Sequence, residues 1–529
     1  MQYISTTRFP ASNIRKPGWL AVLAFAVVAL AAMPLIYVIS SSSGLDAQGW
    51  ARLWQSRLPE LISNTLTLAV TVAITSLLFG LGSAWITARL EFKGRKAAIW
   101  LMVLPLTLPT YVLAHIYTVV SDDDGWLGGI WLALGGNSLD VYNLAGTTLV
   151  LSLAGFSYIY LLAFSALTQM TRDREEAARL LGANRLRVFL TVQLPLLRPA
   201  LAAGMAVIIL HVFSDFGAVS MLRYQTFTLA IYNQMTGRMD FQAAAALSLM
   251  LVFFSLTFLV LERFFRRKQR FYASAQSKLH ERKQLSSKQT VLVWTWLGGI
   301  ATLSFIMPAI WLINWSGIAV DEGLLDSTFW GYAWNSGVVA FSVASITLIL
   351  AFPIAFYHTR KHSHTSNAIV NLSSVGFVLP GPVIALGILA FILAQLPWAY
   401  GTLLALLLAL SIRFLPLAVQ SEESALQQLT PSIEQAGRML GAGPLGNLRR
   451  VVFPVIRSGL AAAWVLVFID ALKELPATLI LRPTGFDTLP VRIWMEASEE
   501  MLELAAPAAL VLVVGTFPAI WLMMKAQRH

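Results

Sequence analysis

The sequence contains no cysteine and little charge. With none of its 529 residues a cysteine, disulfides and thiolate metal sites are excluded. Only 12% of the residues are charged, whereas 57% are apolar and the mean hydropathy is +0.68. Soluble domains carry roughly 25% charged residues, so this composition indicates a chain that lies in lipid.

Several enzyme motifs are also missing. The sequence has no G-x-x-x-x-G-K-[ST] phosphate loop, no H-E-x-x-H zinc motif and no G-x-S-x-G nucleophile elbow. The chain therefore cannot bind ATP through such a loop, and no paired catalytic constellation stands out. A membrane-embedded enzyme is disfavoured for the same reason.

About a dozen apolar stretches reach the roughly 20 residues that are needed to cross a ~30 Å hydrocarbon core. Each is expected to be helical, because lipid offers no partners to backbone groups. The first stretch is too long for a signal-peptide core and lacks a small-residue cleavage site, which favours an uncleaved anchor. The predicted fold is an all-α polytopic membrane protein of about 12 transmembrane helices. The stretches lie at 19–40, 65–86, 97–120, 144–168, 201–219, 243–261, 291–313, 336–357, 368–394, 399–419, 458–479 and 503–525.

The net charge of +11 is a topology signal, because the basic residues collect in alternate loops. This alternation follows the positive-inside rule and predicts that both chain termini lie in the cytoplasm. It also argues against a nucleic-acid partner. The basic loops carry Arg89, Lys93, Arg95 and Lys96, then residues 172–198, residues 263–288, and Arg360 with Lys361. The loops between them carry Asp122, Asp123, Asp124 and Asp140, then Asp321, Glu322 and Asp326, and finally the acidic residues of 496–503.

The polar, basic segment 264–290 divides the chain into two halves of six spans each. Since six is even, the second half begins on the same membrane side as the first, which predicts a parallel repeat. The predicted organisation is an anchor helix and loop (1–59), a first transmembrane domain (60–263), a linker (264–290), a first helix and loop of the second half (291–330), and a second transmembrane domain (331–525).

Matches at constant offsets support the duplication. Asn64 and Asn335 precede the second span of each half, and Pro109 and Pro380 lie inside the third, both at an offset of 271. Further along, the offset is 259. The first half therefore carries about twelve extra residues between these points, which fall in its long acidic loop at 121–143.

A polar element recurs once per half at that second offset and is predicted to form a helix, a turn and a second helix. The acidic residues of its first turn suit a helix N-terminus, and its glycines suit the left-handed position that ends a helix. Asn184 suits the cap of the second helix in the first copy, and Pro444 suits the first helical position in the second copy. A surface loop that merely orders two helices is the competing interpretation. The candidate residues are Glu175, Glu176, Ala177, Arg179 and Gly182 in the first copy, and Glu434, Gln435, Ala436, Arg438 and Gly441 in the second.

This element resembles the "EAA loop" of binding-protein-dependent ABC importer permeases. The matching residues are Glu176-Ala177-Ala178, Gly182, Val192 and Leu194-Pro195. The second copy departs from the pattern, because Gln435 replaces the glutamate, Gly437 the second alanine and Phe453 the leucine. Glu434 keeps a carboxylate in the same turn, and docking is expected to survive.

The resemblance implies two fused transmembrane domains of the type I importer fold in a bacterial inner membrane. It further implies that each loop sits in a groove of a separate cytoplasmic ABC ATPase, expected in two copies, and that a periplasmic solute-binding protein delivers the cargo. ATP and Mg²⁺ would be used by the ATPase, with no cofactor bound by this chain. A closing ATPase pair would then rock one half against the other and give alternating access.

A stretch of the second half resembles the "KELPAT…LRP…FDTL" sequence of fused ferric-iron importer permeases. It begins at Lys473-Glu474-Leu475-Pro476 and ends at Phe486-Asp487-Thr488-Leu489. The resemblance implies ferric iron as cargo. Thiamine and phosphonate- or polyamine-type solutes are the alternative cargoes. A proton-coupled secondary transporter is a further alternative, but it leaves the two repeated loops unexplained.

Ionisable residues at membrane depth are costly and usually face a bundle interior or a pathway. Asp470 and Glu474 lie four residues apart, on one predicted helix face, with Lys473 beside them. Pro476 is expected to break the helix directly after Glu474 and to free carbonyl groups that could line a cavity. These residues are candidates for a translocation pathway or gate.

In the first half, Asp215 aligns with Glu474, and His211 lies one turn before it. Tyr111 and His115 form another pair one turn apart, and oxygen and imidazole groups of this kind could ligate a hard cation in passing. Under the competing interpretation, Glu474 pairs with Lys473 or a neighbouring helix. The histidines would then only form hydrogen bonds across the bundle.

Overall fold

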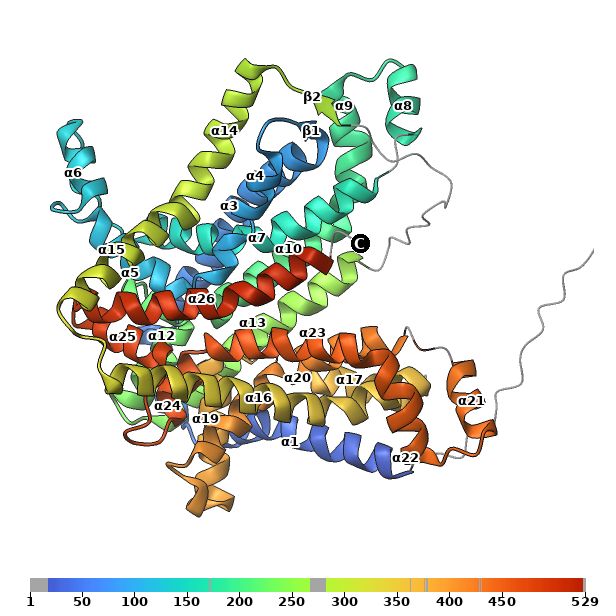
Figure 1. Cartoon of the computed structure of the whole chain (residues 1–529). Helices are drawn as coiled ribbons and strands as arrows, with labels where there is room; N and C mark the ends of the chain where they lie inside the picture. The colour runs from blue at the N-terminus through green and yellow to red at the C-terminus, as the bar shows by residue number, and fades with distance from the viewer. Residues whose placement is uncertain are drawn as a thin grey trace, which may run out of the picture.

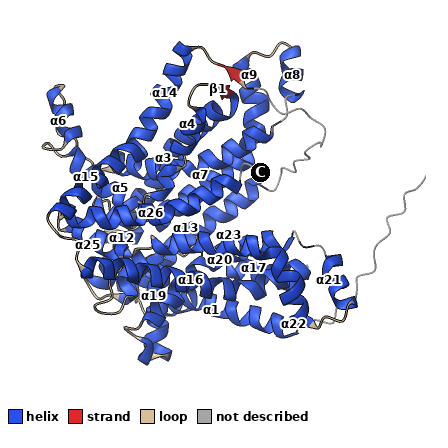
Figure 2. Cartoon of the chain, viewed as in Figure 1, coloured by secondary structure: helices blue, strands red, loops and turns tan. Residues whose placement is uncertain are grey.

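The computed structural model describes residues 18–170, 173–266, 282–361, 363–374, 376, 379–427, 429 and 431–526. The N-terminal basic residues before the first helix and residues 267–281 of the expected linker lie outside this part of the chain. The described residues are almost entirely helical, with one two-stranded parallel pairing between β1 and β2 (Figure 2). The predicted all-α polytopic fold is confirmed.

The first half comprises α1 (Gly18–Ser42), α2 (Ala47–Ser56), α3 (Leu58–Arg89), β1 (Leu90–Glu91), α4 (Arg95–Leu101), η1 (Leu104–Thr107), α5 (Thr110–Ser121), α6 (Trp126–Ala133), α7 (Leu144–Gln169), α8 (Asp173–Leu180), α9 (Arg185–Val188), the π-helical turn η2 (Phe189–Gln193), α10 (Leu194–Ser214), α11 (Gly217–Met221), α12 (Phe227–Thr236) and α13 (Phe241–Arg266).

The second half comprises β2 (Lys283–Gln284), α14 (Ser287–Ala301), the π-helical turn η3 (Thr302–Ile306), α15 (Met307–Asp321), α16 (Ser327–Arg360), α17 (His364–Ser373), α19 (Gly381–Gln395), η4 (Pro397–Ala399), α20 (Leu403–Gln427), α21 (Pro431–Met439), α22 (Pro444–Asn447), the π-helical turn η5 (Leu448–Val452), α23 (Phe453–Leu472), α24 (Pro476–Leu481), α25 (Leu489–Ser498) and α26 (Leu502–Ala526).

Within the described residues, nine helices are long and apolar enough to cross a membrane. A bent pair, Arg95–Thr107 with Thr110–Ala133, and two shorter apolar helices, Gly381–Gln395 and Glu503–Pro518, correspond to the other expected stretches. The expectation of one continuous span at 97–120 is wrong. The chain bends by 97° there, because Pro109 lacks the N–H that a continuing helix needs and instead precedes a new helix.

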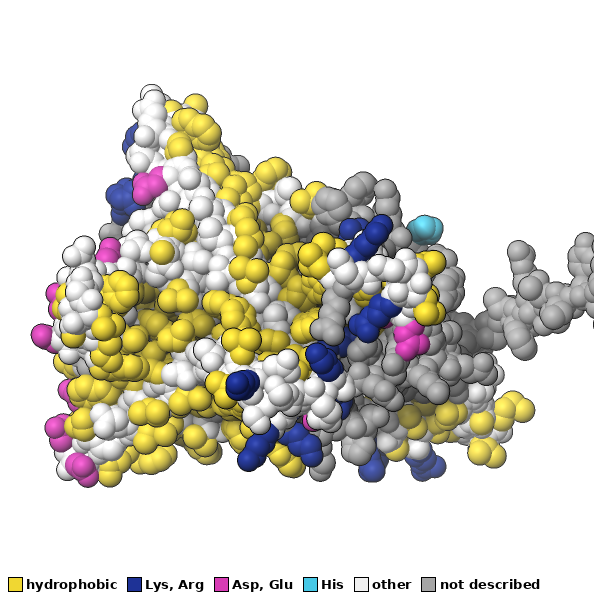
Figure 3. Space-filling model, turned by 90° about the horizontal axis from the view of Figure 1, so that it is seen from above, with side chains coloured by type: hydrophobic (Ala, Val, Ile, Leu, Met, Phe, Trp, Pro, Cys, Tyr) yellow, Lys and Arg dark blue, Asp and Glu magenta, His cyan; other side chains and the backbone are white. Residues whose placement is uncertain are grey.

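The two ends of the helix bundle differ in charge. Figure 1 places α8 at the upper and α21 at the lower part of the right-hand end, and α6 and α25 at the left-hand end. Figure 3, which views the molecule from above, shows most of the visible Asp and Glu side chains at the left edge and most of the Lys and Arg side chains over the right half. The repeated loops therefore share the basic end of the molecule.

The first helix of each half packs on the other half. α1 contacts α16, α17 and α19 of the second half, and α14 contacts α3 and α4 of the first. The approach of α1 to α19 is close, since a Cβ at Gly387 would lie 2.4 Å from the carbonyl oxygen of Pro34. In the middle of α14, the Trp294 indole donates to the Lys93 carbonyl at 3.0 Å. The contacts of α1 and α14 therefore hold the two halves together.

Hydrogen bonds of the two halves repeat with the sequence. The amide of Asn64, on α3, donates to the carbonyl of Gln225 at 3.1 Å, and that of Asn335, on α16, donates to the carbonyl of Asp487 at 2.9 Å. One residue further along each helix, a hydroxyl accepts a backbone N–H. Phe227 donates to Thr65 at 3.3 Å, and Leu489 donates to Ser336 at 2.7 Å.

Candidate functional site: the repeated loops and the intramembrane polar cluster

The first repeated loop is a helix, a turn and a helix, as the sequence predicts. α8 ends at Leu180, and Gly182 adopts the left-handed conformation with φ +83°. Asn184 then caps α9, because its side-chain oxygen accepts the N–H of Arg187 at 2.8 Å. The predicted roles of the glycine and the asparagine in shaping this loop are both confirmed.

The second repeated loop has the same shape, although different residues begin its second helix. α21 ends at Met439, and Gly441 has φ +84°. Pro444 begins α22, where its missing N–H costs no helical hydrogen bond. We refer to α8 and α21 as the loop helices.

Each loop continues through a π-helical turn, which sequence analysis missed. The turns η2 and η5 lie at the same offset of 259, and each directly precedes a helix with a proline at its second position, Pro195 or Pro454. A proline at that point removes a backbone donor, and a widened turn accommodates the loss. The repeated proline was the signal that could have predicted it.

The two glutamates at the start of the first loop point in different directions. Glu175 is 3% exposed, and its Oε1 lies 2.7 Å from Nη2 of Arg89 at the end of α3. Glu434, also buried, lies 2.5 Å from Nη2 of Arg360 at the end of α16. By contrast, Glu176 and its equivalent Gln435 are exposed. The carboxylate that both copies retain is therefore the buried one.

The tips of the loop helices expose large apolar side chains at matching positions. Leu180 and Leu181 are 88% and 89% exposed, and Met439 and Leu440 are both 89% exposed. The predicted loop residues Ala177, Arg179 and Ala436 are also exposed. The side chain of Arg438 lies outside the described residues. Each loop thus presents an unburied apolar pair at the basic end of the bundle.

Gly437, a departure of the second copy from the family pattern, has a steric reason. A Cβ at this position would lie 2.2 Å from Oδ1 of Asn447. The Nδ2 group of Asn447 donates to the carbonyl of Glu434 at 3.2 Å inside the loop. The first copy has Ala178 and Val188 at the equivalent positions. The small residue therefore makes room for an internal hydrogen bond.

The helix after each loop is interrupted inside the bundle. In the first half, α10 ends at Ser214, and Asp215 caps the next short helix by accepting the N–H of Ala218 at 2.9 Å. The other carboxylate oxygen accepts the hydroxyl of Thr110 at 2.6 Å. Asp215 is buried, and its carboxylate therefore stabilises the break between α10 and α11.

Glu474 stabilises the equivalent helix break in the second half, between α23 and α24. Its carboxylate accepts the N–H groups of Ala477 and Thr478, both at 3.1 Å, and forms an ion pair with Arg413 of α20 at 3.3 Å. The expectation that Glu474 shares a helix face with Asp470 is wrong, because α23 already ends at Leu472. The break precedes Pro476, which occupies the first position of α24.

The remaining polar residues lie between the two halves. Asp470, near the end of α23, has an exposed side chain. His211 and Lys473 are half-buried. All three interact electrostatically with one another. Lys473 also donates to the carbonyl of Leu106 in the first half at 3.0 Å. The structure thus brings together Asp215, His211, Asp470, Lys473, Glu474 and Pro476 around the paired helix breaks.

Arg413 is a member of this cluster that sequence analysis missed. Besides Glu474, it contacts the Ser214 hydroxyl of the first half at 3.2 Å. An arginine near the middle of a predicted span was the available signal. Tyr111 and His115 are both buried in α5, and the ring of His115 packs edge-on against Trp311. No group of three or more His, Asp or Glu side chains suited to a metal ion occurs in the part of the chain that is described.

Two ferric transport permeases match most of the chain. An Fe(3+)-transport system permease protein of Haemophilus influenzae is 31% identical over 516 residues, which cover 97% of this chain and 99% of the relative. A ferric transport system permease protein of Actinobacillus pleuropneumoniae is 26% identical over 454 residues, which cover 81% of this chain and 65% of the relative.

A shorter relative matches about half of the chain. A sulfate transport system permease protein of Escherichia coli is 28% identical over 256 residues, 46% of this chain but 90% of the relative. This length suits a duplicated unit. The sequence also matches the family described as "Binding-protein-dependent transport system inner membrane component" twice, over residues 76–270 and 347–525. The chain is therefore a multi-pass inner membrane protein that belongs to this family of transport permeases.

Proposed function

We propose that this chain is the membrane-spanning subunit of an ATP-driven importer for ferric iron. Two ferric permeases align with most of the chain, one of them along nearly its whole length. The geometry of the two loops supports the second part of the proposal, which is that separate ATPase subunits drive the import. Two loops of the same shape, related by duplication, emerge at one end of the bundle, where a pair of identical soluble subunits could bind both (Figure 1).

The proposed partner at each loop is a cytoplasmic ABC ATPase, one copy per loop. Leu180 with Leu181, and Met439 with Leu440, are almost fully exposed at the loop tips. Burying a leucine side chain stabilises by about 1.5–3 kcal/mol, so an apolar groove would bind these tips favourably. ATP and Mg²⁺ would be held by the ATPase, and this chain would bind no cofactor of its own.

The proposed topology places the loop helices and both termini in the cytoplasm. The acidic end that carries α6 would then face the periplasm, where a solute-binding protein delivers the cargo. Asp470, His211, Lys473 and Arg413 would line the route between the halves. When the ATPases close, the halves would rock about this cluster, and access would alternate between the two membrane faces.

The proposal is tested by reconstituting the chain with its ATPase and binding protein in proteoliposomes. We expect ⁵⁵Fe³⁺ to accumulate only when ATP is present, and neither [¹⁴C]thiamine nor [³⁵S]sulfate to accumulate. Uptake of thiamine or sulfate in place of iron would contradict the cargo. Uptake that persists without ATP but collapses with a protonophore would instead identify a proton-coupled carrier.

Binding at the loops is tested separately. Replacing Leu180 and Leu181 together with Asp is expected to lower the ATPase that co-purifies with detergent-solubilised complexes from two copies per chain to one, because charge cannot enter an apolar groove without its solvation cost. The matched replacement of the exposed residues Leu132 and Leu134, at the opposite end of the molecule, should leave co-purification intact.

A further inference from the structure

The long helix α3 is attached at both of its ends. At the loop end, Arg89 forms its buried ion pair with Glu175 of the loop helix α8. At the opposite end, Asn64 and Thr65 hold the segment that joins α11 to α12, through Gln225 and Phe227. Asn64 and Arg89 lie 25 residues apart in one continuous helix, which corresponds to about 37 Å along its axis.

The long helix α16 is attached in the same way. Arg360 forms its ion pair with Glu434 of the loop helix α21, and Asn335 lies 25 residues earlier. Asn335 and Ser336 hold the segment that joins α24 to α25, through Asp487 and Leu489. Both attachments occupy equivalent positions in the two halves, although the residues at several of them differ.

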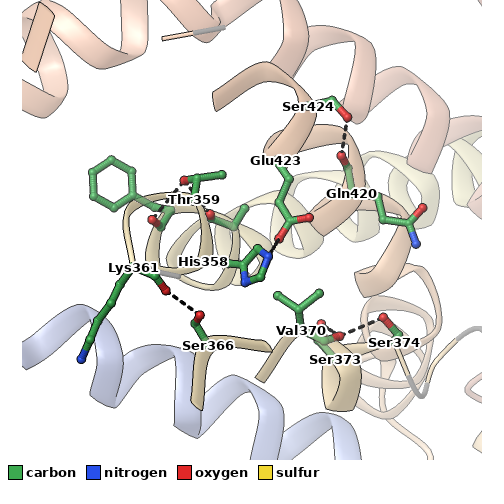
Figure 4. Close-up of polar contacts among 12 residues, drawn as sticks. His358, Thr359, Lys361, Ser366, Val370, Ser373, Ser374, Gln420, Glu423 and Ser424 are labelled. Carbon is green, nitrogen blue, oxygen red and sulfur yellow. Dashed lines mark hydrogen bonds and ion pairs between the residues drawn. The ribbon is translucent and has the colours of Figure 1, made fainter. Parts of the chain in front are cut away.

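The loop end of each long helix is also fixed sideways. In the first half, Thr87 forms a hydrogen bond with Tyr160 of α7 at 3.2 Å. In the second half, His358 at the equivalent position faces Glu423 of α20, with 3.9 Å between Nε2 and Oε1 (Figure 4). Ser366 of α17 also donates to the Lys361 carbonyl at 2.5 Å. These contacts limit how far the arginines can move without their helices.

The segments held at the opposite ends lead to a contact between the two halves. Tyr232 belongs to α12 and Trp494 to α25, and their ring centroids lie 6.0 Å apart. Phe216, at the first helix break, packs against both rings. The indole of Trp494 also donates to the Ser220 hydroxyl of the first half at 3.0 Å. This aromatic contact joins the halves beyond the polar cluster.

We propose that α3 and α16 act as two connecting rods, each carrying the displacement of its loop helix through its Arg–Glu pair to the aromatic contact at the far end. The inference rests on the proposed function, since an ATPase must move the loop helices. The Arg89–Glu175 pair is buried and the Arg360–Glu434 pair is partly buried. An ion pair shielded from water resists separation more than an exposed one, because its charges are poorly screened. A continuous helix then transmits the shift, and the asparagine end draws the α12 and α25 segments with it.

The rods are tested in the reconstituted complex by the ratio of ⁵⁵Fe³⁺ taken up to ATP hydrolysed. Arg89→Gln together with Arg360→Gln is expected to lower this ratio about tenfold, while the ATPase still co-purifies. Asn64→Ala together with Asn335→Ala should lower it similarly, although these residues lie far from any ATPase. An unchanged ratio in either double variant overturns the proposal. So does loss of ATPase binding in the arginine variant, because the pairs would then only shape the docking surface.

A charge exchange and a matched control complete the test. Exchanging the partners, with Arg89→Glu plus Glu175→Arg and Arg360→Glu plus Glu434→Arg, is expected to recover at least part of the ratio. Failure of this exchange, in a complex that still assembles, would count against a role for the ion pairs themselves. Lys96→Gln together with Lys361→Gln removes the same charge from nearby exposed positions and should not alter the ratio.

A cargo-independent measurement separates this inference from the proposed function. Since the chain has no cysteine, spin labels can be placed at Glu60→Cys and Trp330→Cys, exposed positions near the far ends of α3 and α16. ATP trapping is expected to shift the distance between the labels, and the arginine variants should lose this shift. If the distance still shifts in the arginine variants, the proposal that α3 and α16 transmit the movement is contradicted. Absence of iron uptake by the unaltered complex would refute the cargo instead, whatever the labels report.

Discussion

The two repeated loops have the same backbone shape, and six of the nine residues at 175–183 are identical to their equivalents at 434–442. Both contain a left-handed glycine and a buried glutamate paired with an arginine, at Gly182 with Glu175 and at Gly441 with Glu434. Positions at the helix surface have diverged, as Glu176 and Gln435 show. What the duplication preserved is therefore the attachment of each loop to its own half. The motif letters that identify the family were preserved less strictly.

The divergent positions follow local packing. In the second loop, Asn447 reaches back to the Glu434 carbonyl, and Gly437 leaves room for it. In the first loop, the equivalent residues are Val188, which has no polar side chain to place, and Ala178. The two positions adjoin in the second loop, so the small residue at Gly437 matches the larger polar residue at Asn447.

Replacing both left-handed glycines is expected to have the largest effect on this shared geometry. Gly182→Val with Gly441→Val should abolish uptake, because each side chain at positive φ costs at least roughly 1–2 kcal/mol and the turn would be lost. No atom lies within 4 Å of a Cβ at either position, so the effect would come from the backbone alone. Uptake assays would test it, with Gly443→Val, at ordinary φ in the same loop, as control. Normal uptake by the double variant would contradict the prediction.

The helix breaks offer the next comparison. Glu474→Ala is expected to impair uptake more than Asp215→Ala, since Glu474 also neutralises Arg413, whereas Asp215 has a threonine hydroxyl as its partner. Leaving the arginine unpaired in a half-buried site costs on the order of 3–5 kcal/mol by analogy with buried pairs, with solvent reducing that cost. Uptake rates should be compared in complexes of equal abundance. Equal rates for Glu474→Ala and the unaltered chain would confine Glu474 to a structural role.

Restoring the family alanine in the second loop should be harmful. Gly437→Ala is expected to destabilise the loop by about 1–3 kcal/mol, because the new methyl group overlaps Asn447. Adding Asn447→Val, which recreates the first copy, should recover most of this loss. Thermal unfolding and ATPase co-purification would both report it. Ala178→Gly in the first loop serves as the reverse exchange, and it should cost only the helix propensity of alanine over glycine, about 1 kcal/mol.

The smallest effect is expected at the exposed position that differs between the loops. Glu176→Gln makes the first copy resemble the second, which already carries Gln435. Exposed charges contribute about 0–1 kcal/mol, so uptake should change by no more than a few-fold. A loss of uptake as large as that of the glycine variants would show that the two loops bind their partners through different chemistry.

Sequence analysis predicted the loops well because their signals are local. Gly182, Asn184, Gly441 and Pro444 each occupy the position that their backbone preferences favour. It predicted the helix breaks only in part. Pro476 indicated the break in the second half, although Glu474 was placed on the preceding helix, which ends at Leu472, and Pro109 was placed inside a span. A break in lipid requires side chains that satisfy the freed backbone groups, and those partners come from elsewhere in the fold.

By itself, the sequence determined the membrane class, the duplication, the charged ends and the shape of each loop, because composition, offsets and turn residues act over short distances. Only the tertiary structure decided which glutamate is buried and which helix crosses to the other half. It also showed that Arg413 joins Glu474 and that Asn64 reaches Gln225. These contacts join residues far apart in the chain, and their geometry depends on how whole helices pack against one another.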